Sequence, residues 1–252
     1  MKKELKDAIA VFAKGHCVGK SVTHHYEANQ IGSIWQLRDA PRKNALNYRK
    51  EEYVACGIAP SKVDSIAREK TRGRFFICDI VPTSVDDALH RREFKNLGYR
   101  LLATEPFFVH DLKRIPSPKN KSVKIELVEE ASLAARLGKA MNMRPLTEAY
   151  FGERGLFRQY VALDGKQIVG WVRSVPAGKS NWCSTLGVME SHRRRGIGQT
   201  LLAEMLRADR RLGVATSVLL ASHTGALLYP SLGYKQIGML YIYAPKAAKE
   251  ES

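Results

Sequence analysis

The regular alternation of strand-like and helix-like segments over residues 124–243 constrains the fold most strongly. Apolar residues recur at helical spacing in some segments, and alternate or run continuously in others. The Asp164-Gly165 pair between two strand-like runs is typical of a hairpin turn. We expect strand, helix, three strands, helix, strand, helix and strand, at residues 124–128, 131–143, 160–163, 168–175, 182–188, 198–212, 217–221, 225–232 and 234–243. This order indicates a mixed α/β protein whose central sheet is mostly antiparallel and flanked by helices.

A change of composition divides the chain before this region. The stretch KRIPSPKNKSV at 113–123 holds two prolines, two serines and four basic residues, with little to bury, and is typical of an exposed linker. We therefore expect an N-terminal domain at 1–112, a linker at 113–122 and a C-terminal domain at 123–252. The first domain should begin with an amphipathic helix that buries Leu5, Ala8, Ile9 and Phe12, and should contain strands near 33–37, 53–56 and 75–80 and a helix near 61–71.

A short internal repeat connects the two halves. FKNLGYRLLATE at 94–105 and YPSLGYKQIGML at 229–240 share Leu-Gly-Tyr followed by a basic residue. In both places a helical pattern precedes the shared residues and a strand pattern follows them. The repeat predicts a tandem of two similar units, the first of them degenerate. Phe94 occupies the position that Tyr229 has in the second copy, so the first copy lacks that hydroxyl.

The motif that carries chemistry is Arg193-x-x-Gly196-x-Gly198, which follows a predicted strand and opens a predicted helix. Glycines at these positions allow backbone N–H groups to point into a concave loop. The first helical turn adds unpaired N–H groups and the positive end of its dipole. With three consecutive arginines at 193–195, the segment predicts a binding site for a pyrophosphate.

This pattern resembles the signature of the GNAT family of acyl-CoA-dependent N-acyltransferases, Arg/Gln-x-x-Gly-x-Gly/Ala. The resemblance covers residues 123–243 in the correct order of elements. Glu190 stands where the family usually has proline, and Ser222 stands where asparagine is frequent. The first half has no such motif and resembles the family only in a degenerate form. A second family segment, Ala-x-x-Tyr-x-x-x-Gly-Phe/Tyr, is matched by Ala226, Tyr229, Gly233 and Tyr234.

The resemblance implies an acetyl-CoA-dependent N-acetyltransferase with acetyl-CoA as co-substrate and an unidentified primary amine as acceptor. The amine would attack the thioester directly in a ternary complex, and Tyr229 would give a proton to the departing thiolate. The pantetheine arm would lie between two splayed strands, one ending at Val188 and one starting near residue 217. The implied cofactor-binding residues are Leu186, Val188, Arg193, Arg194, Arg195, Gly196, Ile197, Gly198, Gln199 and Ser222.

The general base is not identified by the sequence. Glu190 lies beside the phosphate loop and is more consistent with a structural role. Cys183 lies on the preceding strand, and a buried thiol is a better interpretation than an acyl-carrying nucleophile. A proton relayed by water, or an amine that is already neutral, stays open as an alternative.

Cysteine and histidine spacing predicts neither a disulfide framework nor a metal site. The four cysteines are widely scattered, and no pair of Cys or His has the spacing of a structural zinc site. The longest apolar run is far shorter than the roughly 20 residues that span a bilayer. We expect a soluble, cytoplasmic protein without a membrane partner, either a monomer or a homodimer.

The charge leaves further functions open. The chain has 41 Lys plus Arg against 25 Asp plus Glu, a net charge of +16, which favours polyanionic partners. The basic residues form no long tract, and no aromatic-basic stacking motif is evident, so nucleic acid is not the favoured partner. The alternatives are a non-catalytic acyl-CoA-binding regulatory module and an acyltransferase for an RNA-borne or ribosome-associated amine.

Overall fold

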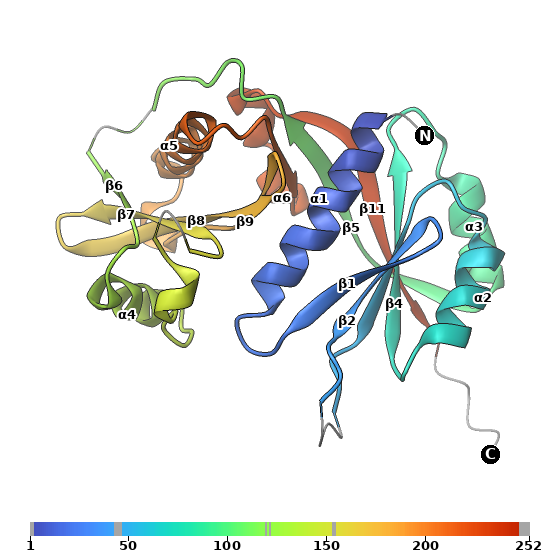
Figure 1. Ribbon diagram of the computed structural model, residues 1–252. Coiled ribbons are helices and arrows are strands. Elements are labelled where there is room, and N and C mark those ends of the chain that lie inside the picture. Colours follow the sequence, from blue (N-terminus) through green and yellow to red (C-terminus); the bar gives the residue numbers. More distant parts are fainter. Residues whose placement is uncertain (1–2, 43–46, 119, 121, 153–154, 247–252) are drawn as a thin grey trace. The chain divides into compact units, whose positions relative to one another are not determined.

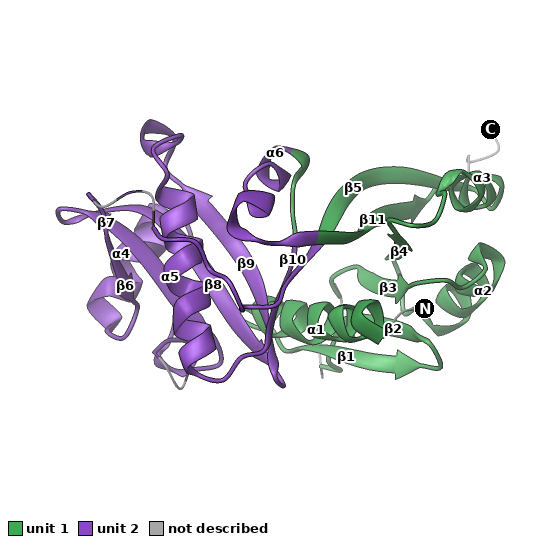
Figure 2. Ribbon diagram, turned by 90° about the horizontal axis from the view of Figure 1, so that it is seen from above, with its two compact units in different colours: residues 1–107, 220–223, 236–252 green, residues 108–219, 224–235 purple. Residues whose placement is uncertain are grey.

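The computed structural model describes residues 3–42, 47–118, 120, 122–152 and 155–246 (Figure 1). The chain forms two compact units that are not consecutive in sequence (Figure 2). The first unit comprises residues 1–107, 220–223 and 236–252, and the second comprises residues 108–219 and 224–235. The last strand of the chain therefore belongs to the first unit.

The first unit is an open, mixed sheet with helices on its faces. Its strands follow the order β1-β2-β3-β4-β11-β5. The pairs β1–β2, β2–β3 and β4–β11 are antiparallel, and the pair β3–β4 is parallel. Its elements are α1 (Lys3–Lys20), β1 (Tyr26–Ile31), β2 (Ile34–Asp39), β3 (Glu51–Ala55), α2 (Pro60–Lys70), β4 (Phe75–Pro82), α3 (Ala88–Asn96), most of β5 (Tyr99–His110) and most of β11 (Lys235–Pro245).

Helices cover the sheet of the first unit because each presents one apolar stripe to it. Helix α1 packs on β1 and β2 and buries Leu5, Ala8, Ile9 and Phe12, as predicted (Figure 1). Helices α2 and α3 pack over another core cluster, which contains Val63 from α2, Phe94 from α3 and several aromatic rings from the strands.

The second unit has a sheet of the same kind. Its strands follow the order β10-β9-β8-β7-β6, antiparallel except for the parallel pair β9 and β10. Its elements are β6 (Lys124–Leu127), α4 (Ala131–Ala140), η1 (Glu148–Tyr150), β7 (Arg158–Asp164), β8 (Gln167–Ala177), β9 (Ser180–Val188), η2 (Glu190–His192), α5 (Ile197–Arg211), β10 (Thr216–Leu220), α6 (His223–Ala226) and η3 (Tyr229–Leu232).

Helix α5 is fixed to this sheet by apolar packing and by one buried ion pair. Arg158 of β7 donates from Nε and Nη2 to Oδ1 of Asp209 on α5, at 3.0 and 2.7 Å. Ser174 of β8 and Asn181 of β9 also donate to the Asp209 carboxylate. Asp209 is fully buried, and a buried carboxylate needs such partners. The network sets the position of α5, and so of the loop before it.

The predicted mixed α/β architecture, with a mostly antiparallel sheet flanked by helices, is confirmed. The helix expected over 225–232 is instead two short segments, α6 and η3. The α-helix ends at Ala226, and Pro230, which has no N–H to continue an α-helical ladder, lies in the 3₁₀ segment that follows. None of the helices in the described ranges is both long and apolar enough to cross a bilayer.

Candidate active site

Strand β9 separates from β10 over much of its length. The two strands pair only from Ser180–Thr216 to Trp182–Val218, whereas β9 continues to Val188. In the strand order, β9 has no neighbours other than β8 and β10. Residues 183–188 therefore extend past the paired region, with one backbone edge directed away from β8. The splayed pair that the sequence resemblance implied is present.

A bulge interrupts β9 within the part of the strand that does not pair with β10. The β8–β9 register shifts between Trp171 and Arg173, and Thr185 has a φ of +51°. That conformation is unfavourable for a β-branched residue and is typical of functional sites. Gly187 is required beside it, because a Cβ atom there would lie 2.5 Å from the Trp171 indole. The bulge changes the direction in which the backbone N–H and C=O groups point in the segment that contains Leu186 and Val188.

The loop between β9 and α5 forms a concave, basic surface. Arg194 has a φ of +61° and Gly196 a φ of +77°; left-handed residues in such a turn direct successive N–H groups toward one point. The first helical hydrogen bond of α5 runs from Thr200 N to Gly196 O, so the preceding N–H groups are not used by the helix. A pocket of about 440 Å³ is lined by Val188, His192, Arg193, Arg194, Gly196, Ile197, Gly198, Gln199, Thr224 and Leu228.

The three arginines of the loop are not neutralised by nearby carboxylates. Arg193, Arg194 and Arg195 are exposed, and none of them forms an ion pair with an acidic side chain in the described part of the chain. Arg193 Nε donates to Val188 O at 3.3 Å, which ties the loop to the end of β9. Cationic side chains beside a helix N-terminus have the chemistry that suits a phosphate-bearing ligand.

The other residues predicted to bind the cofactor differ in how they are placed relative to this pocket. Ile197 is buried, and Gln199 Nε2 donates to Ser231 Oγ at 2.8 Å. The Arg195 carbonyl accepts from Asn120 Nδ2 at 2.8 Å. Leu186, Arg195 and Tyr229 are not among the lining residues, and Ser222 lies between β10 and α6, in residues that group with the first unit.

Tyr229 is a buried phenol at the start of η3. Its side chain is 6% exposed, and its ring packs against those of Phe108 and Tyr234, with centroids 5.5 Å away in both cases. Within the described residues its hydroxyl makes no hydrogen bond. Burial raises the pKa of the Tyr229 hydroxyl. The group therefore keeps its proton at neutral pH.

Cys183 of β9 has the properties expected of a buried thiol. It is 3% exposed, and burial raises its pKa well above the ordinary thiol range. A thiol that stays protonated is a poor nucleophile. These properties favour the structural interpretation of Cys183 over an acyl-carrying one.

His110 was not singled out by the sequence, yet it holds the turn that carries Tyr229. It is almost fully buried. Its Nε2–H donates to Leu232 O at 2.9 Å, and its Nδ1 accepts from Leu112 N at 2.8 Å. Gly233, with a φ of +94°, passes so close that a Cβ would lie 3.0 Å from His110 Nε2. No local pattern indicates this role, because the partners lie 122 residues apart.

Comparison with known proteins agrees with this geometry. Residues 156–236 match the sequence model of the acetyltransferase (GNAT) domain. That segment includes the bulged strand, the basic loop and Tyr229. No curated protein sequence matches the chain significantly.

Solved structures with the same fold cover nearly the whole chain. A GCN5-related N-acetyltransferase from Kribbella flavida has 15% identity and a TM-score of 0.64, with 96% of each chain covered. A functionally unknown conserved protein from Staphylococcus epidermidis has 17% identity and a TM-score of 0.60, covering 90% of this chain and 96% of its own. A GCN5-related N-acetyltransferase from Sphaerobacter thermophilus has 17% identity and a TM-score of 0.57, covering 95% of this chain and 91% of its own. Residues 156–236 therefore match the GNAT acetyltransferase domain, in a chain with the overall fold of the GCN5-related N-acetyltransferases.

Proposed function

We propose that this chain transfers an acetyl group from acetyl-CoA to a primary amine. The GNAT fold supports acyl-CoA-dependent N-acetyl transfer in general. The observation that carries the specific proposal is the basic loop at 193–198, whose arginines have no carboxylate partner in the described residues. This loop follows the end of β9 that does not pair with β10. A pyrophosphate and a neighbouring phosphate would satisfy those charges.

The chain's own groups divide the binding task between them. Backbone N–H groups at the start of α5 and the guanidinium groups of Arg193 and Arg194 would hold the phosphates through charge-assisted hydrogen bonds. The edge of β9 around Leu186 and Val188 would bond to the amides of the pantetheine arm. Both features belong to the second unit.

The reaction then needs three proton or charge adjustments. The acceptor ammonium, with an ordinary pKa of about 10, must lose a proton before its nitrogen attacks the thioester carbonyl. The C–N bond forms and the C–S bond breaks, and the oxygen of the carbonyl carries negative charge in between, for which backbone N–H groups at the β9 bulge are suitable donors. Tyr229 would protonate the departing thiolate. No residue is assigned as the base.

The first test is calorimetric titration of acetyl-CoA into the protein and into the Gly196→Glu variant. A carboxylate in the loop would repel the phosphates and fill their space. Gly178→Glu is the matched control, since Gly178 lies in the β8–β9 turn of the same unit, has a φ of +69°, and has open space at its Cβ position. We expect a Kd in the micromolar range for the wild type and the control, and roughly 100-fold weaker binding for Gly196→Glu.

The outcomes separate the candidate functions. Binding to the wild type that Gly196→Glu abolishes supports the proposal and justifies a screen of amine acceptors with detection of released thiol. Tight binding without turnover for any amine in the screen would favour a non-catalytic acyl-CoA-binding module. Absence of binding to the wild type would contradict the acetyltransferase proposal.

A further inference from the structure

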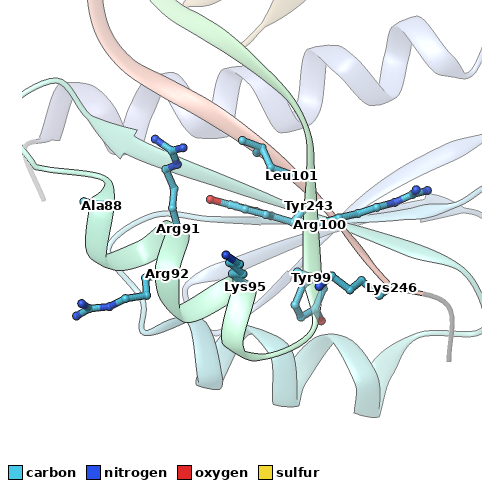
Figure 3. Close-up of a pocket in the computed structure, with 9 residues that line it drawn as sticks. All are labelled: Ala88, Arg91, Arg92, Lys95, Tyr99, Arg100, Leu101, Tyr243 and Lys246. Atoms are coloured by element: carbon cyan, nitrogen blue, oxygen red, sulfur yellow. The ribbon is translucent and has the colours of Figure 1, made fainter. Parts of the chain in front are cut away.

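A second basic pocket lies entirely within the first unit. It has a volume of about 630 Å³ and is formed by α3, the start of β5 and the end of β11 (Figure 3). It shares no residue with the loop at 193–198. A pocket of this size is in the range that accommodates small organic ligands. Its lining residues are Ala88, Arg91, Arg92, Lys95, Tyr99, Arg100, Leu101, Tyr243 and Lys246.

The charge in this pocket is almost entirely positive. Five of its lining residues are Arg or Lys, and of these only Arg91 forms an ion pair within the described residues, with Asp87 Oδ2 at 3.5 Å. The Asp87 carboxylate is shared, because it also accepts a hydrogen bond from the Tyr241 hydroxyl. Arg91 and Lys95 are four residues apart on α3, so they lie on one helix face and repel each other. A bound polyanion would relieve this repulsion.

The buried hydroxyl of Tyr243 is a second, independent indication that this pocket binds a ligand. Its side chain is 3% exposed, and its ring stacks on Phe94 with a centroid distance of 4.4 Å. Its hydroxyl is buried and has no hydrogen-bond partner in the described part of the chain. In Figure 3 the phenol lies among the lining residues with its oxygen on the side of Arg91. An unsatisfied buried hydroxyl is costly, and an anionic oxygen beside Arg91 could accept a hydrogen bond from it.

The pocket also has an apolar part. Leu101 is 41% exposed, and Ala88 at the start of α3 is exposed as well. A simple inorganic anion would leave these surfaces in water, whereas an organic group attached to a phosphate would cover them. We propose that this pocket binds a small organic phosphate with at least two negative charges, held by Arg91, Lys95 and Arg100 with Tyr243 as an additional donor.

The test is calorimetric titration of ADP, as a probe of this class, into the Gly196→Glu protein at about 50 mM salt. That background removes the anion site of the second unit, and its melting temperature is checked first. If Gly196→Glu lowers the melting temperature, the double variant Arg193→Gln with Arg194→Gln replaces it. The pocket variant is Lys95→Gln with Arg100→Gln. The control, Lys6→Gln with Lys62→Gln, removes the same charge from exposed positions of the same unit.

We expect one ADP per chain, binding at least tenfold weaker in the pocket variant, and within about twofold of the parent in the control. Tyr243→Phe should weaken ADP binding several-fold without lowering the melting temperature, since the hydroxyl makes no bond within the described protein. Pyrophosphate should bind more weakly than ADP.

Four results would overturn the proposal. The first is the absence of ADP binding, and the second is an equal loss of ADP binding in the pocket variant and the control. The third is pyrophosphate binding as tight as that of ADP. The fourth is binding of a single-stranded RNA that is tighter than that of ADP and is abolished in the pocket variant. The second would indicate diffuse charge attraction, the third a plain anion site and the fourth a nucleic-acid surface. Because ADP binding is measured in a protein whose loop at 193–198 is disabled, the result tests the pocket of the first unit separately from the acetyltransferase proposal.

Discussion

Phe94 and Tyr229 stand at matching positions of the short sequence repeat, and their rings make similar contacts. Each precedes a glycine in the left-handed region, Gly98 with a φ of +82° and Gly233 with a φ of +94°. Phe94 meets the ring of the tyrosine five residues later at 5.7 Å and 80°, and Tyr229 does so at 5.5 Å and 72°. The first copy achieves the same packing without a hydroxyl. Packing alone therefore does not require the hydroxyl of Tyr229.

This comparison makes Tyr229→Phe an informative substitution. If the hydroxyl protonates the leaving thiolate, turnover should fall by roughly 10²- to 10⁴-fold, while acetyl-CoA affinity and the melting temperature stay unchanged. Steady-state kinetics with the acceptor found in the amine screen, together with calorimetry, measures all three. Tyr160→Phe is a matched control, since Tyr160 is a phenol of the same unit and is also 6% exposed. Turnover within about threefold of the wild type would remove Tyr229 from the mechanism.

Residues that act through local patterns could be predicted from the sequence, and residues that act through distant contacts could not. Arg193, Gly196 and Gly198 stand at fixed spacing between a strand and a helix, and the structure places all three at the pocket before α5. Asn120 holds the same loop through Arg195, which is 75 residues away. It stands in a segment whose composition indicates only a linker. No short-range signal marks such a contact.

At the scale of elements, periodicity predicted most segments of the second unit because their apolar faces are well defined. Strand β1 was missed, since only Tyr26 of its six residues is buried and it shows no clear alternation. The signal that could have found it is the Gly32-Ser33 pair. Ile31 pairs with Ile34 across this two-residue turn, and Gly32 has a φ of +58°, as hairpins of this length require.

The turn that carries Tyr229 should be sensitive to pH through His110. Burial lowers the pKa of His110, although the nearby Asp111 carboxylate opposes this effect. In the unfolded chain the imidazole would protonate near its usual pKa of about 6.5. Below that pH the unfolded state binds more protons than the folded state, so the contribution to stability is complete above pH 6.5 and is lost as the pH falls.

Urea unfolding at pH 7.5 and pH 5.5 tests this expectation. The free energy of unfolding should decrease more on acidification for the wild type than for His110→Gln, which retains an N–H donor but does not titrate. The difference in that decrease should be on the order of 1 kcal/mol. Equal decreases for the two proteins would show that His110 does not control the stability of this turn.

At the scale of the whole molecule, the units do not follow the order of the sequence. Strand β11 comes directly after η3 of the second unit, yet it pairs with β4 of the first, from Gly238–Pro82 to Tyr243–Ile77. It also contributes Tyr241 and Tyr243 to the core beneath α2 and α3. The sequence division into 1–112 and 123–252 would assign this strand to the second domain. Periodicity identifies a strand but does not say which partner it will pair with.

Removal of the last strand should therefore damage the first unit. A chain that ends after Tyr234 lacks the partner of β4 and two buried aromatic rings, and we expect it to be cleaved within residues 1–107 by low concentrations of trypsin. A chain that ends after Lys246 is the control. Mass spectrometry of the early fragments locates the first cuts. Protection of residues 1–107 in the shorter chain would show that β11 is not needed for the first unit.

The placement of β11 also bears on biosynthesis. A ribosome makes residues 1–107 before β11 (Lys235–Pro245), the strand that pairs with β4. At ordinary elongation rates β11 is added on the order of ten seconds later. Until then the edge of β4 is an unpaired strand of apolar residues, which is prone to pair with other chains. The first unit must therefore complete its folding after translation of the second, and chaperone binding to the nascent chain would be most useful in that interval.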